Sequence, residues 1–420
     1  MPKVIIIGAG VSGLFAAYRL LQHHISVELY DQNAIAGVKW LLAGASGLNL
    51  SAFYSKEQMK DFYGEAAPYF DKWLSVFSAK ELGQFVSELG GSLEKGSAHR
   101  LLEKKLSAKE MLNRWWQKLI QEESFSFFPH HRFLSFKREE STLLLEVENT
   151  EKAHRFWISG DAVLFACGGA SYPQTGSDGK WKKAFEAHSL PITPFAPSNC
   201  SFSVCWSEQL FPFTKGRIQY RYLKNVALGV DAEKEKVRGD LVLTPTGVEG
   251  LPLYRHSAFL RKKIQTEGKA VVFIDLFPDL TIEQIQKRVR NPIRKKTLSH
   301  YLHSTLSLSK EGFSLLMESL PASLLKLFRE SPIKEETLQH LKSIPLPLVG
   351  VGALAKAIST AGGVPLNAVT EKLMLSQQAG FFVCGEMVDW EAPTGGFLMQ
   401  GCFTTASVAT EGILEWLDKR

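Results

Sequence analysis

The sequence predicts an α/β protein in which a Rossmann-like nucleotide-binding domain is split by an insertion of about 150 residues. Three observations predict this arrangement. A strand, a glycine turn, a helix and a second strand follow one another within residues 1–31. Apolar runs at 162–166 and 380–384 are typical of strands buried on both faces. Between these two runs, beyond Pro191, the pattern changes to short alternating strands and then to helices.

The opening segment has the signature of a dinucleotide site. The apolar run Val4–Ile7 leads into a turn that contains three glycines. Gly8 permits the tight turn, Gly10 lets the backbone approach a pyrophosphate, and Gly13 lets the helix pack closely on the strand. The helix N-terminus then presents free N–H groups to the phosphates. Asp31 ends the second strand, where a carboxylate accepts hydrogen bonds from the ribose of an adenine dinucleotide.

The alternative for this segment is a secretory signal peptide, because Lys3 precedes an apolar stretch that runs into Ala16 and Ala17. Three glycines would weaken a hydrophobic helix, and the pattern continues into a strand instead of a cleavage site. We therefore favour the nucleotide-binding interpretation.

Composition predicts an ordinary globular protein. The chain has 420 residues, 45% of them hydrophobic, with a formal net charge of +6. No apolar stretch approaches the roughly 18 residues of a membrane span. The five cysteines form no Cys-x-x-Cys pair, which favours reduced thiols over disulfides or a metal site. We expect a cytoplasmic protein with a small-molecule substrate, no membrane partner and no metal.

Changes of pattern give the expected domain boundaries. Residues 1–193 form the first part of the nucleotide-binding domain, and 351–420 complete it. The inserted module covers 194–350, with a β-rich part at 194–274 and a helical part at 275–343. Within the first part, spacings of three and four residues predict mainly helices over 56–121, and alternation predicts antiparallel strands over 125–160.

A second cofactor signal lies near the C-terminus. The strand predicted at 380–384 ends in Gly385, Glu386 and Asp389, which suits an acid directed at the ribityl hydroxyls of a flavin. Gly395 and Gly396 then precede a helix whose N-terminus would face the flavin's pyrimidine edge. The alternative is a glycine-rich turn without a ligand.

Two loops supply a third signal. The loop 37–51 follows the ribose-binding acid, and within it Lys39 offers charge to a phosphate while Asn49 offers an amide to the flavin. A solvated loop is the alternative. The buried strand at 162–166 runs into the small-residue loop 167–176, where we interpret Cys167 as a packed small residue because no resolving cysteine stands nearby.

These segments together resemble the NAD(P)/FAD-dependent oxidoreductases of the aminoacetone-oxidase family, a branch of the glutathione-reductase-like flavoproteins. The resemblance covers essentially the whole chain, and it is carried by the segments 8–13, 39–51, 169–177, 275–279, 360–364, 385–389 and 393–397. Most relatives have Gly-Arg-Lys and Arg-Cys-Asn in the first loop. Here Val38 and Leu48 replace the arginine and the cysteine, which looks like a sub-branch with Gly-Leu-Asn-Leu.

The resemblance implies noncovalent FAD, a Rossmann-like FAD domain and an inserted module made of a small β-barrel and a helical bundle. It implies no single substrate, since relatives include reductases of unsaturated steroid-type ketones and amine oxidases. No second glycine fingerprint for NAD(P)H is present in the insert, so a nicotinamide would visit the flavin transiently.

Three further constellations leave alternatives open. Lys287, Arg288, Arg290 and residues 294–296 form a basic stretch that suits either a solvated helix or nucleic acid. The segment 253–257 offers a phenol, a cation and an imidazole, which suit either a proton donor near the flavin or a structural role. His130 and His131 are adjacent, so they point to opposite faces of a strand and cannot readily share a metal.

The sequence thus predicts an FAD-dependent oxidoreductase that transfers hydride through flavin N5, by reduction of an unsaturated carbonyl or oxidation of a small amine. The alternatives are a flavoprotein that acts on nucleic acid and a flavin-bound sensor without turnover. No catalytic residue is assigned. The predicted cofactor-binding residues are Gly8, Ala9, Gly10, Ser12, Gly13, Asp31, Lys39, Gly47, Asn49, Ala166, Gly168, Gly385, Glu386, Asp389, Gly395, Gly396 and Phe397.

Overall fold

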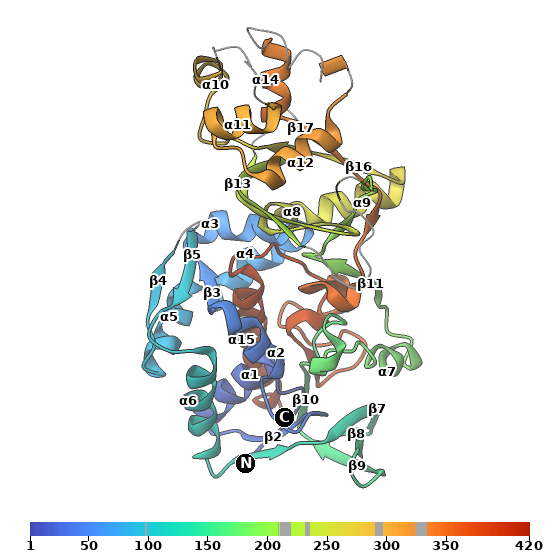
Figure 1. The fold of residues 1–420 in the computed structure, drawn as a ribbon. Helices are drawn as coiled ribbons and strands as arrows, with labels where there is room; N and C mark the ends of the chain where they lie inside the picture. Colours follow the sequence, from blue (N-terminus) through green and yellow to red (C-terminus); the bar gives the residue numbers. More distant parts are fainter. Residues whose placement is uncertain are drawn as a thin grey trace. The chain divides into compact units, whose positions relative to one another are not determined.

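A computed structural model describes residues 1–96, 99–208, 210, 220–231, 236–289, 297–321, 323, 324 and 334–420. The chain forms two compact units, one made of residues 1–198 and 354–420 and the other of 199–353 (Figure 1). The second unit begins at Asn199 and not at 194 because β11 (Thr193–Ser198) pairs antiparallel with β19 (Ser359–Gly363) inside the first unit. It ends at Ala353, three residues beyond the expected 350.

A parallel sheet organises the first unit. Its five described strands run in the order β20 (Phe381–Val383), β10 (Ala162–Phe165), β1 (Lys3–Ile7), β2 (Ser26–Tyr30) and β6 (Phe125–Phe128). Every neighbouring pair is parallel. β10 and β20 are buried along their whole length, which explains why their sequences are continuous apolar runs. Residues from both ends of the chain therefore share one sheet.

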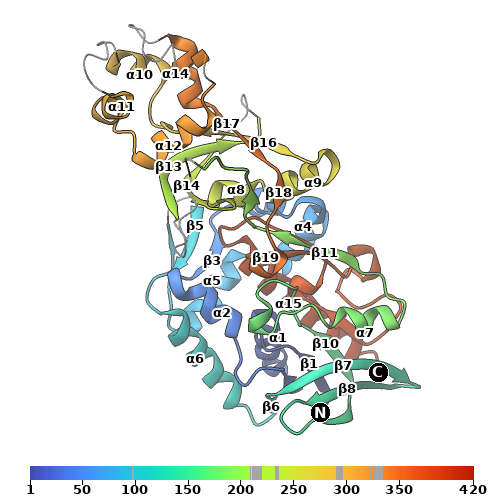
Figure 2. The same ribbon diagram turned by 45° about the vertical axis from the view of Figure 1, so that its right-hand side comes forward.

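Two helices fill the layer beside this sheet. Helix α1 (Val11–Gln22) packs against α15 (Phe397–Leu417), and both views place them together (Figure 2). Phe15 of α1 meets Phe403 of α15 edge to face, with ring centroids 4.9 Å apart. Phe77 and Phe85 contact the same Phe15 ring at 4.9 Å, so one aromatic cluster joins the helices that follow β3 to the nucleotide-binding core.

The segment 31–121 is mainly helical, and its part 56–121 agrees with the helices that the spacing predicts. Its helices are α2 (Val38–Ala43), η1 (Gly44–Ser46), α3 (Lys56–Met59), η2 (Lys60–Ala66), α4 (Ala67–Val76), α5 (Ala79–Glu88) and α6 (Ala108–Ile120). A small antiparallel sheet of β3 (Asn49–Ala52), β5 (Arg100–Glu103) and β4 (Leu93–Lys95) interrupts them. These strands are three or four residues long, too short to show an alternating pattern.

The expectation of antiparallel strands over 125–160 was right for only part of that range. β7 (His131–Glu139), β8 (Thr142–Asn149) and β9 (His154–Gly160) form an antiparallel sheet. β6 was predicted wrongly, because it pairs in parallel with β2 and extends the central sheet. The unit also contains η4 (Pro173–Thr175), α7 (Lys182–Ala187), η5 (Leu354–Lys356), η6 (Leu366–Ala368) and η7 (Gly385–Met387).

The second unit is built on an antiparallel sheet. Its described strands run in the order β17 (Ile344–Leu348), β16 (Ala270–Asp275), β13 (Arg221–Gly229), β14 (Val237–Thr244), β15 (Gly247–Glu249), β12 (Phe202–Ser203) and β18 (Gly350–Val351). Among the described residues its helices are α8 (Leu251–Arg255), α9 (Ser257–Glu267), α10 (Ile282–Arg288), α11 (Leu298–Leu306), α12 (Lys310–Ser319) and α14 (Glu335–Lys342). The part expected to be β-rich, 194–274, therefore also contains two helices.

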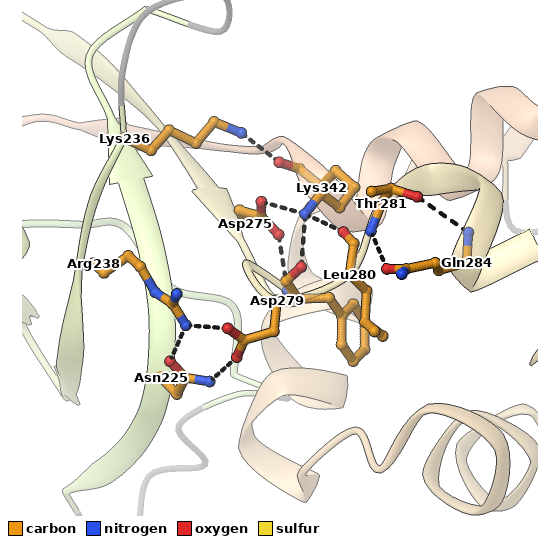
Figure 3. A network of polar contacts seen from close by, with 10 residues as sticks. Asn225, Lys236, Arg238, Asp275, Asp279, Leu280, Thr281, Gln284 and Lys342 are labelled. Carbon is orange, nitrogen blue, oxygen red and sulfur yellow. Dashed lines mark hydrogen bonds and ion pairs between the residues drawn. The ribbon is translucent and has the colours of Figure 1, made fainter.

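A polar network ties the helical part of this unit to its sheet (Figure 3). The Lys342 ammonium lies 2.7 Å from an Asp275 carboxylate oxygen and also donates to two backbone carbonyls at 2.6 and 2.7 Å. Asp279 accepts from Arg238 at 2.5 Å and from Asn225 at 2.7 Å. The two acids of the 275–279 segment thus hold α14 and the loop after β16 against β13 and β14, which is a structural role.

Within the described part of the chain, no helix combines the length and the apolar character needed to cross a bilayer.

Candidate functional site

The candidate site is a pocket in the first unit, at the carboxyl ends of its parallel strands. The loops that follow β1, β2, β10 and β20 all contribute lining residues. In open α/β sheets this edge is where ligands bind. The lining residues that the sequence predicted are Gly8, Ala9, Gly10, Ser12, Asp31, Lys39, Ala166, Gly168, Gly385 and Glu386.

The three glycines of the first turn have different surroundings. A Cβ on Gly8 would lie 2.4 Å from the Ala166 carbonyl oxygen, and φ at Gly8 is +105°. A Cβ on Gly13 would lie 1.8 Å from the Gly8 carbonyl oxygen. A Cβ on Gly10 meets nothing within 4 Å. Gly8 and Gly13 are therefore required for packing of strand, turn and helix, whereas Gly10 leaves the backbone open toward the pocket.

Asp31 holds the turn in place from the end of β2. One carboxylate oxygen accepts from the Ala9 N–H at 2.6 Å, and the other accepts from the Asn33 N–H at 2.7 Å. Burial raises the pKa of Asp31, and these two hydrogen bonds oppose the rise. Each oxygen keeps a further lone pair with which to accept from a ligand hydroxyl. The residue thus supports the backbone and also lines the pocket.

Lys39 and Glu386 form an ion pair in the pocket wall. The Lys39 ammonium lies 2.9 Å from a Glu386 carboxylate oxygen and donates to the Ser171 hydroxyl at 2.9 Å. The second Glu386 oxygen accepts from the Thr360 N–H at 3.3 Å. These contacts bring together residues from four segments that are distant in the sequence. Glu386 balances the charge of Lys39, a pairing that the sequence analysis did not predict.

The N-terminus of α15 reaches the pocket through residues that the sequence did not single out. Leu398, Met399 and Cys402, on its first two turns, line the pocket. No side chain caps the N-terminus of α15, and Leu398 and Met399 of its first turn place this positive end of the helix dipole beside the lining. The glycine turn before the helix is required sterically, because a Cβ on Gly396 would lie 2.1 Å from the Ser51 carbonyl oxygen.

Seven predicted site residues do not line the pocket, namely Gly13, Gly47, Asn49, Asp389, Gly395, Gly396 and Phe397. Phe397 is buried, and its ring stacks on Phe62 with centroids 4.1 Å apart. Asp389 accepts from the Gly362 N–H at 3.1 Å. Asn49 differs from these two, because its buried amide oxygen has no hydrogen-bond partner among the described residues.

One wall of the pocket consists of residues that are absent from the predicted cofactor-binding set. Thr175, Gly176, Ser177, Asp178, Lys180 and Trp181 line it from the loop after β10. The Ser177 hydroxyl is buried without a hydrogen-bond partner among the described residues. Gln32 and Asn33 tie this loop to β2 by donating to the carbonyls of Gly176 and Thr175 at 2.7 and 3.1 Å. The small-residue composition of 167–176 was the available signal.

His131 and Arg132 line the pocket from β7. The His131 ring nitrogen Nδ1 lies 2.7 Å from the Pro129 carbonyl, and Arg132 pairs with Glu148. His130 lies 3.4 Å from Glu151. Among the residues that the structure describes, no group of three or more histidines, cysteines and acids could hold a metal ion.

Three thiols in the pocket wall are unreactive by their environment. Cys167, Cys384 and Cys402 all line the pocket, and all are free. Burial raises the pKa of Cys402 to about 12, with the Glu386 charge adding to the rise. Burial also raises the pKa of Cys167 and Cys384. Because the thiolate is the nucleophile, these cysteines act as packed small residues near neutral pH.

The residues present fit an extended dinucleotide. Gly10 leaves backbone open to the pocket, and Ser177 has a buried hydroxyl without a partner among the described residues. The first two turns of α15 contribute lining residues. Carboxylate, hydroxyl and N–H groups are the types that bind ribose and phosphate.

Residues 2–412 match the family described as the HI0933-like protein Rossmann domain. The chain belongs to this family of FAD-binding Rossmann flavoproteins. It is 23% identical over 430 residues to the 3-dehydro-bile acid delta(4,6)-reductase of Clostridium scindens, with 99% of this chain and all of the relative covered. It is 21% identical to the ribosomal RNA dihydrouridine synthase of Haemophilus influenzae, with 96% of each covered.

Solved structures confirm the predicted fold class. The 3-ketosteroid delta1-dehydrogenase from Sterolibacterium denitrificans aligns with a TM-score of 0.53 at 11% identity, over 99% of this chain and all of that chain. At this identity the likeness shows the fold: a Rossmann FAD-binding domain with a parallel sheet and an inserted antiparallel sheet.

Proposed function

We propose that this protein is an oxidoreductase that holds noncovalent FAD in the pocket of its first unit and reduces a carbon–carbon double bond conjugated to a carbonyl. The observation that supports it best is the pocket itself, where four parallel-strand ends and the N-terminus of α15 supply groups suited to a dinucleotide. When bound, FAD supplies hydride transfer through N5.

The residues divide between the two halves of the cofactor. In this proposal the turn at Gly8–Gly10 and Asp31 hold the ADP half, as the sequence predicted. Lys39, Glu386 and the first turns of α15 hold the flavin half. The positive end of α15 stabilises negative charge on the reduced ring. The buried hydroxyl of Ser177, which lines the pocket, finds a partner in the cofactor. Asn49 lies outside the pocket lining, so its contact with the flavin stays a prediction.

The substrate class rests on what two relatives have in common. One is named a reductase of a 3-dehydro-bile acid delta(4,6) system, and the other a dihydrouridine synthase. A 3-keto-4,6-diene has double bonds conjugated to its ketone, and the uridine double bond that dihydrouridine lacks is conjugated to the C4 carbonyl. In each case hydride addition to a double bond conjugated with a carbonyl leaves an enolate-type charge, which a proton must neutralise at carbon.

A proton donor is therefore needed, and the 253–257 segment that the sequence offered for this role lies on α8 and at the start of α9 in the second unit. Burial lowers the pKa of His256, and its Nε2 atom is buried without a partner among the described residues. Substitutions Tyr254→Phe and His256→Gln distinguish the two by their effect on the pH profile of flavin reoxidation.

The test begins with the cofactor. The purified protein should carry a yellow chromophore that is released by heat and identified as FAD by mass spectrometry. Anaerobic addition of NADH or NADPH should bleach the flavin, and a 3-keto-4-ene steroid should restore its absorbance. A saturated 3-ketosteroid is the matched control, because it lacks the conjugated double bond. Bleaching by small amines instead would favour amine oxidation, and a flavin that never reoxidises with an added acceptor would favour a sensor.

The second candidate function is reduction of uridine in RNA. Lys287 and Arg288 are exposed at the C-terminal end of α10, although Glu283 on the same helix interrupts the charge. Arg290 and residues 294–296 lie outside the described residues. Salt-sensitive copurification of RNA would support this function, and so would dihydrouridine formed on transcripts by the reduced protein. Unchanged RNA retention in Lys287→Ala/Arg288→Ala would count against a role for this helix.

A further inference from the structure

A second cavity lies in the first unit. It measures about 490 Å³, within the range of small-molecule sites. The β3–β5–β4 sheet lines it together with α3, α4 and the start of α5. None of its lining residues lines the nucleotide pocket. A ligand bound in this cavity would therefore contact none of the residues that line the nucleotide pocket, and its binding does not depend on the proposed function.

The cavity has an apolar interior. Met59 and Leu74 are each 2% exposed, and Leu93 and Leu101 of the sheet contribute further apolar surface. On α5 the lining includes Gly83, where a Cβ would meet nothing within 4 Å. A glycine in the middle of a helix weakens it relative to alanine. At this position its effect is to leave space in the cavity.

The charged residues that line this cavity are all cationic, namely Lys56, Lys80 and Lys95. None of the three forms an ion pair with a carboxylate among the described residues. Lys56 donates to the Ser75 hydroxyl at 2.8 Å, and the Lys95 ammonium lies 3.2 Å from the centroid of the Phe53 ring. The Phe53 side chain is 49% exposed, so a large apolar ring and a cation stand together at the opening.

We propose that this cavity binds an amphipathic organic anion, with its hydrocarbon body among Met59, Leu74 and Leu93 and its carboxylate or sulfonate beside Lys80 and Lys95. Burial of the hydrocarbon supplies the larger part of the affinity, because its apolar surface is removed from water. The lysines supply selectivity for the anion over a neutral compound of the same length.

Titration calorimetry of the FAD-loaded protein with decanoate and with decan-1-ol tests this. We expect saturable binding of decanoate that weakens as salt rises, and weaker binding of decan-1-ol. Lys80→Ala/Lys95→Ala should weaken decanoate by about tenfold and leave decan-1-ol unchanged. Lys109→Ala, which removes an exposed lysine outside the cavity lining, is the matched control.

A cavity-filling variant completes the test. Gly83→Leu places a side chain in the open space on α5 and should abolish binding of both compounds, while flavin absorbance and the far-ultraviolet spectrum stay unchanged. Absence of saturable decanoate binding overturns the proposal. Equal effects of Lys109→Ala and the double variant also overturn it, as does full affinity in folded Gly83→Leu.

Discussion

The two halves of the nucleotide pocket are built in different ways. The half around Gly8–Gly10 and Asp31 comes from one short stretch of chain, and backbone groups make its contacts. The half around Lys39 and Glu386 joins residues 347 positions apart by side-chain contacts. In the first half, a Cβ at Gly8 or Gly13 would clash with backbone atoms. In the second half, the contacts are an ion pair between side chains, so substitutions there should lower the free energy of unfolding by less.

Gly13→Val should have the largest effect. Its side chain would start 1.8 Å from a backbone carbonyl oxygen, which cannot move without displacing β1 from α1. We expect a loss of about 3 kcal/mol in the free energy of unfolding together with loss of FAD. Gly10→Ala is the control, since its Cβ meets open space. It should unfold at the wild-type denaturant midpoint and lose only cofactor affinity. Equal midpoints for both variants would remove the distinction between the glycines.

Asp31→Ala should rank second. It removes the acceptor for two backbone N–H groups as well as the proposed ribose contact. We expect about 2 kcal/mol of destabilisation and lower FAD occupancy after purification. The loss of the ribose contact explains the lower occupancy, and the loss of the hydrogen bonds from the Ala9 and Asn33 N–H groups explains the lower stability. Wild-type occupancy measured by the flavin-to-protein absorbance ratio would exclude Asp31 from the cofactor site.

The Lys39–Glu386 pair should give a smaller effect. Its side chains are 27% and 14% exposed, so solvent screens the interaction in part. We expect Lys39→Met and Glu386→Gln each to lower the free energy of unfolding by about 1 kcal/mol. The double variant should cost less than the sum, because each single variant leaves one charge without its partner. Strict additivity in a double-mutant cycle would show that the pair contributes nothing to this half of the pocket.

The smallest effect concerns pH. Burial raises the pKa of Asp31 in the folded protein above its value in the unfolded chain. As pH falls, the folded protein therefore binds a proton at Asp31 at a higher pH than the unfolded chain does. Protonation then favours the fold slightly, and it removes an acceptor for ribose hydroxyls. FAD retention in dialysis should therefore fall at a pH above the ordinary aspartate range, and Asp31→Asn should flatten that profile. A wild-type profile identical to that of Asp31→Asn would assign the titration to another group.

Local chemistry explains which parts were predictable. Residues 4–7, 162–165 and 381–383 are apolar and buried, and such continuous apolar runs can be recognised in the sequence. β4 and β5 were missed because three or four residues cannot display a period. The pairing of β6 was wrong because the same residues suit a parallel or an antiparallel neighbour. Ser177 and His131 were not assigned to the site, since a hydroxyl or imidazole has no local pattern that marks it as pocket-facing.

The α/β class, the glycine turn, the acid at the end of β2 and the presence of an insertion could all be predicted from the amino-acid sequence, because each depends on residues close together in the chain. The folded structure was needed to show that Lys39 pairs with Glu386, that Phe397 packs on Phe62 outside the pocket lining, and that the loop after β10 forms a wall of the pocket. Those contacts join distant segments, and long-range packing alone sets which side chains face one another.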